Sequence, residues 1–121
     1  MLIFTYGSLM SGLRNHRVIT AAGGQFVKNA RIVGTLHAYC SAYPAVVTGD
    51  TLIKGEVYDV PVKGVLALDF FEGEGYLYHR RSVVTEDGDR VSVYMMTAET
   101  VRGPIISDGD WRRFKEALDR R

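Results

Sequence analysis

The stretch Tyr6-Gly7-Ser8-Leu9 is the first part of the sequence whose residue types could hold a ligand. It follows residues 2–5, a short apolar run that is typical of a buried strand. A glycine-containing turn at such a strand end exposes backbone N–H groups that can bind a carboxylate or a developing oxyanion. The simpler interpretation is an ordinary turn. The sequence therefore predicts a candidate anion site at residues 6–9.

Glu72 is the best candidate for an acid/base group. Val65 and Leu68 precede it by seven and four positions, so the three side chains share one face of a predicted helix. Glu72 also stands in the last turn, where the helix dipole disfavours an anion. Burial and the dipole both raise the pKa of the carboxyl group toward the range that suits a general base. A solvated or salt-bridged Glu72 is the alternative.

Two other acids compete with Glu72 for this role. Glu74 stands between two glycines beyond the predicted helix and is expected to be an exposed loop acid. Glu56 shares a strand face with Tyr58, which makes it either a rival base or a buried structural partner.

Tyrosines are numerous for a chain of this length. We expect Tyr6, Tyr43 and Tyr78 to contact a ligand, although each could instead belong to the core or its rim. Tyr78 and Arg80 are expected to share one face of a strand. The tyrosines under consideration are Tyr6, Tyr43, Tyr58, Tyr76 and Tyr78.

Other kinds of active site have little support. His16, His37 and His79 are far apart in the sequence, so no zinc site is expected, and no motif predicts a cofactor. Ser8 lacks the G-x-S-x-G elbow of a serine nucleophile. Cys40 lacks a Cys–His signature and is expected to be a small buried hydrophobic residue.

Composition places the chain among ordinary globular proteins. Its 121 residues suit a single domain, residues 1–121, and the net charge of +1 gives no reason to expect nucleic acid as a partner. No apolar stretch approaches the ~20 residues that span a membrane, and no signal peptide is apparent. The single cysteine favours a cytoplasmic location. The arginines at 112, 113, 120 and 121 are expected on a solvated helix face, and a monomer and a homodimer are both compatible with the sequence.

The elements that would position these residues are short strands and a few helices. We expect an α+β protein, in which a small mixed, mostly antiparallel six-stranded β-barrel carries two or three flanking helices. The predicted strands are 2–6, 25–39, 43–47, 52–60, 80–86 and 90–97, the last two joined at Asp87-Gly88-Asp89. The predicted helices are 13–22, 62–72 after Pro61, and a C-terminal helix capped at Ser107-Asp108.

The sequence resembles the gamma-glutamylcyclotransferase-like family, which includes gamma-glutamylamine cyclotransferase and small bacterial and archaeal relatives. Four stretches carry the resemblance, in the same order and spacing, from Leu2 to about Met96. Each is weak alone, but the four together are fairly specific. They are FTYGSL at 4–9 with Gly12 and Asn15-His16 behind it, GEVY at 55–58, LDFFE at 68–72, and YHR at 78–80.

The resemblance implies a small mixed barrel with a cavity on one side, and a reaction that needs no cofactor. The α-amine of a γ-glutamyl group attacks its own side-chain carbonyl, forming 5-oxoproline and releasing an amine. The loop matching Tyr6, Gly7, Ser8 and Leu9 would bind the glutamyl end through backbone N–H groups. Glu72 would be the acid/base, and the substrate would be a small γ-glutamyl molecule.

Alternatives to a cyclotransferase stay open at this point. A barrel of the same fold could bind a small carboxylate ligand or a protein partner without catalysis. Hydrolysis by Ser8 is a weaker possibility. The leaving amine is equally open among a free amino acid, a cross-linked lysine, glutathione and a biosynthetic amine.

Overall fold

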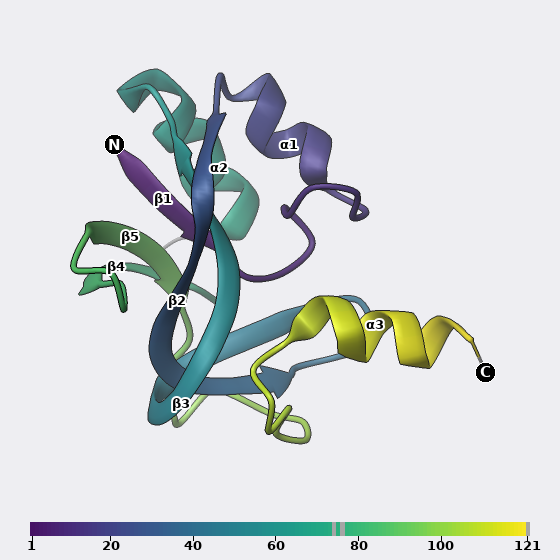
Figure 1. Ribbon diagram of the computed structural model, residues 1–121. Helices are drawn as coiled ribbons and strands as arrows, with labels where there is room; N and C mark the ends of the chain where they lie inside the picture. Colours follow the sequence, from purple (N-terminus) through teal and green to yellow (C-terminus); the bar gives the residue numbers. More distant parts are fainter. Residues whose placement is uncertain (74, 76, 121) are drawn as a thin grey trace.

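The computed structural model describes residues 1–73, 75 and 77–120, and these form one sheet with three helices (Figure 1). The sheet has the strand order β2-β3-β1-β5-β4. Strands β1 and β5 pair in parallel, and the other neighbours are antiparallel. The elements are β1 (Leu2–Thr5), α1 (His16–Ala21), β2 (Gln25–Ala38), β3 (Pro44–Asp59), α2 (Val62–Glu72), β4 (His79–Val84), β5 (Arg90–Met95) and α3 (Trp111–Asp119).

Strand β1 lies in the middle of the sheet and is buried on both faces. Successive strand residues point to opposite faces, so Ile3 and Phe4 enter two different hydrophobic clusters. The cluster around Phe4 contains Trp111 of α3, and the cluster around Ile3 contains Ile19 of α1 and Leu68 of α2. The sheet is therefore covered by α3 on one face and by α1 and α2 on the other.

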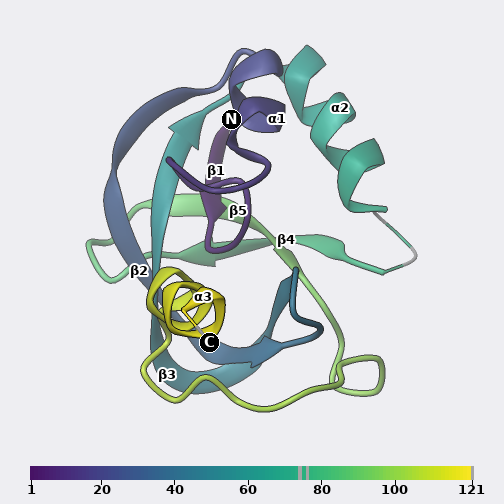
Figure 2. The ribbon, with the colours of Figure 1, turned by 90° about the vertical axis from the view of Figure 1, so that its right-hand side faces the viewer.

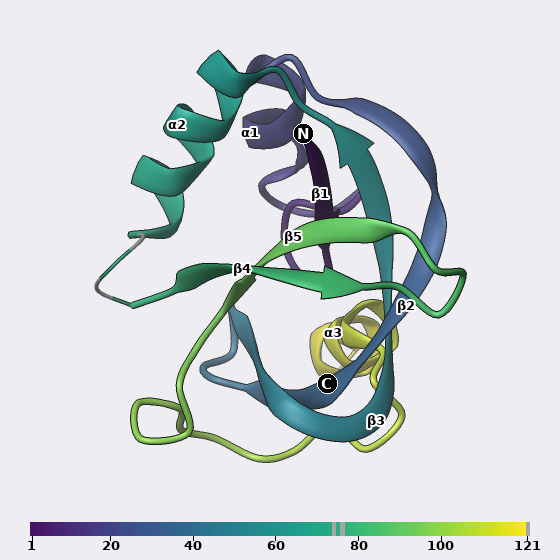
Figure 3. The same cartoon turned by 90° about the vertical axis from the view of Figure 1, so that its left-hand side faces the viewer.

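The views from the two sides show how the helices and the strands lie relative to one another. In Figure 2, α3 is seen end-on inside the curve of β2 and β3, while α1 and α2 lie together at the opposite end of the molecule. In Figure 3, the β4–β5 hairpin crosses the molecule in front of β1, and the C-terminal end of α2 points toward it. Residues 6–9 follow β1 and lie near the C-terminal end of α2 and near β5.

The mixed α+β fold is confirmed, but the prediction of a closed six-stranded barrel is wrong. In the described residues the sheet is open, with five strands and with β2 and β4 as its edges. The predicted strands 43–47 and 52–60 are the two halves of β3, joined by a bulge. Thr51 pairs with Gly34 and Val47 with Thr35, so residues 48–50 have no partners opposite them in β2.

Two of the three helix predictions need correction at their ends. Helix α2 matches the prediction, and Gly73 ends it in the left-handed conformation at φ 62°. Helix α1 is shorter than the predicted 13–22, and α3 is capped by Asp110, whose carboxylate accepts the N–H of Arg113, not by Ser107-Asp108. Asp108 instead pairs with the Arg113 side chain. Within the described residues, none of the helices combines the length and apolar character needed to cross a membrane.

The prediction that Cys40 is buried is also wrong. Cys40 lies where the chain reverses between β2 and β3, and its backbone N–H donates to the carbonyl of Tyr43 at 3.1 Å. Its side chain is exposed and belongs to neither hydrophobic cluster.

Gly55 tests the close packing of β1 against β3. A Cβ atom there would lie 2.4 Å from both Phe4 Cζ and the Thr5 carbonyl oxygen. We therefore expect Gly55→Ala to lower the free energy of unfolding by about 1–3 kcal/mol, as overpacking does elsewhere. Urea denaturation measures this change. Thr48→Ala, on an exposed part of the same strand, is the control and should stay within about 0.5 kcal/mol of the original protein. Equal stability of both variants would contradict the close approach.

Candidate active site

A cavity of about 320 Å³ opens where β1 ends, beside the C-terminal end of α2. Its size lies at the lower end of the range typical of small-molecule sites. Residues from four separate parts of the chain line it. They are Phe4, Thr5, Tyr6, Gly7, Ser8, Leu9, Tyr39, Tyr43, Pro44, Phe70, Phe71, Glu72, Gly73, Leu77, Tyr78 and Tyr94.

Glu72 supplies the one side-chain carboxyl group among the described lining residues. As predicted, it shares a helix face with Val65 and Leu68, which are fully buried. Within the described part of the chain, its carboxylate receives neither a hydrogen bond nor an ion pair. Burial without compensating donors disfavours the charged form and raises the pKa of Glu72 from 4.5 to about 7.

Residues 6–9 form the opposite wall of the cavity. Gly7 lies directly under Pro44, and a Cβ atom on it would come within 2.7 Å of the proline Cγ, so no larger residue fits without movement. The carbonyl oxygens of Gly7 and Ser8 are occupied, because Met10 N–H donates to Gly7 O at 3.1 Å and Asn15 N–H donates to Ser8 O at 2.9 Å.

The backbone N–H groups of the same segment, unlike these carbonyl oxygens, have no partner among the described residues. Among the described residues, the N–H groups of Gly7, Ser8 and Leu9 donate no hydrogen bond. They are available as donors to an anionic or polar group. The Ser8 hydroxyl accepts a hydrogen bond from Asn15 Nδ2 at 3.0 Å, while His16 Nδ1 lies 2.9 Å from the Leu9 carbonyl oxygen. Ser8 therefore lacks the histidine partner that a hydrolytic nucleophile needs.

The tyrosines divide into structural walls and a rim. Tyr6 donates its hydroxyl to the Tyr94 carbonyl at 2.7 Å, and Tyr78 donates to the Pro44 carbonyl at 2.7 Å. Burial raises the pKa values of Tyr6, Tyr78 and Tyr94, so all three stay protonated. Tyr43 lies at the rim and is 45% exposed.

Tyr94 is a lining residue that sequence reasoning missed, and Asp69 is its hydrogen-bond partner outside the lining. Tyr94 lines the cavity and donates its hydroxyl to Asp69 Oδ1 at 2.7 Å, and Arg80 donates to the same oxygen at 2.9 Å. Asp69 stands one helical turn before Glu72, and this spacing could have predicted that the two acids lie near each other on α2. Tyr78 precedes β4 and turns to Pro44, whereas Arg80 turns to Asp69. Glu74 and Tyr76 lie outside the described residues.

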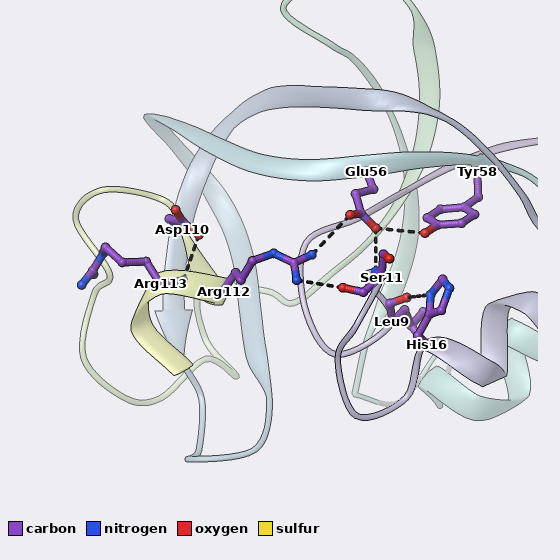
Figure 4. A network of polar contacts seen from close by, with 8 residues as sticks. All are labelled: Leu9, Ser11, His16, Glu56, Tyr58, Asp110, Arg112 and Arg113. Carbon is purple, nitrogen blue, oxygen red and sulfur yellow. Dashed lines mark hydrogen bonds and ion pairs between the residues drawn. The ribbon is translucent and has the colours of Figure 1, made fainter. Parts of the chain in front are cut away.

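Glu56 is a structural partner and does not line the cavity of Glu72. It is 7% exposed, and Figure 4 shows three groups directed at its carboxylate. Ser11 N–H donates at 2.8 Å, the Tyr58 hydroxyl at 2.9 Å, and Arg112 Nη2 at 3.3 Å. The prediction of a solvated face holds only in part for Arg112, whose side chain is 37% exposed but bonded to Glu56. Arg113 and Arg120 are exposed as predicted, and the arginine at 121 lies outside the described residues.

Comparisons with known proteins agree on one family. A family model described as "Gamma-glutamyl cyclotransferase, AIG2-like" matches residues 3–113. The gamma-glutamylcyclotransferase family protein YtfP of Escherichia coli K12 is 30% identical over 115 residues, which cover 92% of this chain and 96% of that protein.

Solved structures give the same result for the fold. A protein from Pyrococcus horikoshii has a TM-score of 0.81 at 25% identity, covering 99% of this chain and 97% of that chain. YkqA from Bacillus subtilis has a TM-score of 0.79 at 30% identity, covering 99% of this chain but 42% of its own. On its sequence match and its fold, the chain belongs to the gamma-glutamyl cyclotransferase, AIG2-like family.

Proposed function

We propose that this protein converts a γ-glutamyl-amine or γ-glutamyl-amino acid to 5-oxoproline and a free amine. Glu72 is the general acid/base, and residues 6–9 bind the glutamyl moiety through their backbone N–H groups. One observation carries the proposal: a carboxyl group with a pKa of about 7 lines the same cavity as Gly7, Ser8 and Leu9, whose N–H groups donate no hydrogen bond to another described residue.

The reaction needs one proton acceptor and then one proton donor. Glu72 removes a proton from the substrate's α-ammonium group, and the freed nitrogen forms a bond to the γ-carbonyl carbon. The carbonyl electron pair moves onto oxygen. When it returns, the bond to the leaving amine breaks and that nitrogen takes the proton from Glu72. The ring nitrogen still carries one proton more than the lactam keeps; it gives this proton to the Glu72 carboxylate, which releases it to the departing amine or to water. A carboxyl group with a pKa near 7 serves both steps at neutral pH.

The cavity contributes to catalysis in two further ways, by folding the substrate and by donating hydrogen bonds to it. The nucleophile and the carbonyl belong to one molecule, so holding the glutamyl chain folded supplies the near-attack geometry. The N–H groups of Gly7, Ser8 and Leu9 provide donors for the α-carboxylate or for the developing oxyanion. We further propose that Tyr43 and Tyr78 contact the substrate from the rim and the wall, and that the protein acts in the cytoplasm.

Replacing the acid/base group tests the assignment directly. Glu72→Gln should keep the fold but lower turnover by about 10²- to 10⁴-fold, because the amide cannot shuttle a proton. Release of 5-oxoproline from a panel of γ-glutamyl-amines, γ-glutamyl-amino acids and glutathione is the measurement. Glu99→Gln, an exposed acid away from the cavity, is the matched control. Normal turnover by Glu72→Gln contradicts the role. Saturable binding without product from any compound favours a non-catalytic carboxylate-binding protein.

The pKa of Glu72 gives a test that needs no substrate. Carboxyl ¹³C NMR should show a midpoint near 7, and a midpoint near 4.5 would contradict the proposed acid/base. Because the folded pKa is raised, the related stability is fully present below about pH 4.5 and is lost as pH rises to about 7. The loss is at most about 1.4 kcal/mol per pH unit. Urea denaturation across this range should show the loss in the original protein and not in Glu72→Gln.

A further inference from the structure

The peptide group of Ser11 is held from both sides by residues far away in the sequence. Its N–H donates to Glu56 Oε1 at 2.8 Å, and its carbonyl accepts from Arg112 Nη1 at 2.8 Å. Arg112 also donates to the second carboxylate oxygen of Glu56 at 3.3 Å, which closes a ring of three groups (Figure 4). We call Ser11, Glu56 and Arg112 the Ser11 anchor.

The anchor joins three elements around one short loop. Glu56 lies in β3 opposite Thr5, the last residue of β1, and Arg112 lies in the first turn of α3. Ser11 comes shortly after residues 6–9, and the turn between Gly7 and Met10 connects the two. A shift of the Ser11 peptide is therefore transmitted through this turn to the amide groups that line the cavity.

The chemistry of the anchor suits precise placement. The Glu56 carboxylate is buried, and three groups donate to it: the Ser11 N–H, the Tyr58 hydroxyl and the Arg112 guanidinium. Charge-assisted hydrogen bonds are shorter and stronger than neutral ones, and the planar fork of arginine fixes direction as well as distance. Here the fork spans the Glu56 carboxylate and the Ser11 carbonyl, so both acceptors are fixed relative to α3.

We propose that Glu56 and Arg112 are positioning residues for the glutamyl-binding segment. They touch neither the cavity nor the substrate, and they act by holding the main chain of residues 7–11 in one conformation. Their effect on turnover rests on the proposed function, since it requires that residues 6–9 bind the substrate. The C-terminal helix thereby becomes a part of the active site's support.

The test removes the fork while keeping the helix and the neutral contacts. Arg112→Met keeps the apolar stem of the side chain. The double variant Glu56→Gln/Arg112→Met removes the buried charge as well, so that folding is not lost to an unpaired carboxylate. Arg113→Met is the matched control, because the Arg113 side chain is next to Arg112 in the sequence but is exposed and pairs with Asp108, away from the loop.

Amide hydrogen exchange by NMR is the first readout. Both Arg112 variants should exchange the amides of Met10 and Ser11, which donate to Gly7 O and to Glu56, on the order of 10-fold faster, with the amides of Ile53 and Val57 in β3 unchanged. The control should match the original protein. Unchanged exchange at Met10 and Ser11, or an equal increase at every amide, overturns the proposal because the contacts would then only stabilise the fold.

Kinetics with the fastest γ-glutamyl compound of the panel is the second readout. KM should rise on the order of 10-fold with a smaller change in kcat, because the segment binds the glutamyl moiety. Unchanged kcat and KM in both Arg112 variants overturns the proposed positioning. Local loosening of residues 7–11 in a protein whose original form releases no 5-oxoproline supports the anchor and contradicts the proposed activity, so the two failures are distinguishable.

Discussion

The burial of β1 on both faces is the constraint on which the rest of the structure depends. Ile3 and Phe4 enter separate clusters on opposite faces, so helices must cover both faces of the sheet. The close contact of Gly55 with Phe4 and Thr5 holds β3 against this strand. Since β1 is short and central, the residues that follow it emerge inside the molecule, between α2 and the β4–β5 hairpin. The cavity forms at that point.

Two glutamates in this protein illustrate how surroundings decide the use of one side chain. Glu56 is buried with donors from Ser11, Tyr58 and Arg112, which stabilise its charge and tie it to the scaffold. Glu72 is partly buried, and the described residues offer it no such donors, so its pKa rises to about 7. A compensated carboxylate holds structure together, whereas an uncompensated one is ready to exchange a proton near neutral pH.

Local signals predicted the elements that depend on nearby residues. Pro61 and Gly73 bound α2, because one suits a helix start and the other adopts a left-handed conformation at its end. Thr48-Gly49-Asp50 has the composition of a turn but forms a bulge within β3. A Cβ on Gly49 would lie 1.9 Å from Thr35 Oγ1, so glycine is there for contact with β2 and not to reverse the chain. No local pattern distinguishes these two uses of glycine.

The sequence by itself determined the inward face of Glu72, the glycine turn after β1 and the order of motifs that identify the family, since these follow from spacing along one helix or strand. Only the tertiary structure decided that, of Glu56 and Glu72, the second lines the cavity and the first supports the loop. It also decided that Arg112 reaches Glu56 and Ser11 and that the sheet stays open. These outcomes depend on contacts between residues far apart in the chain, and helical or strand periodicity carries no information about such contacts.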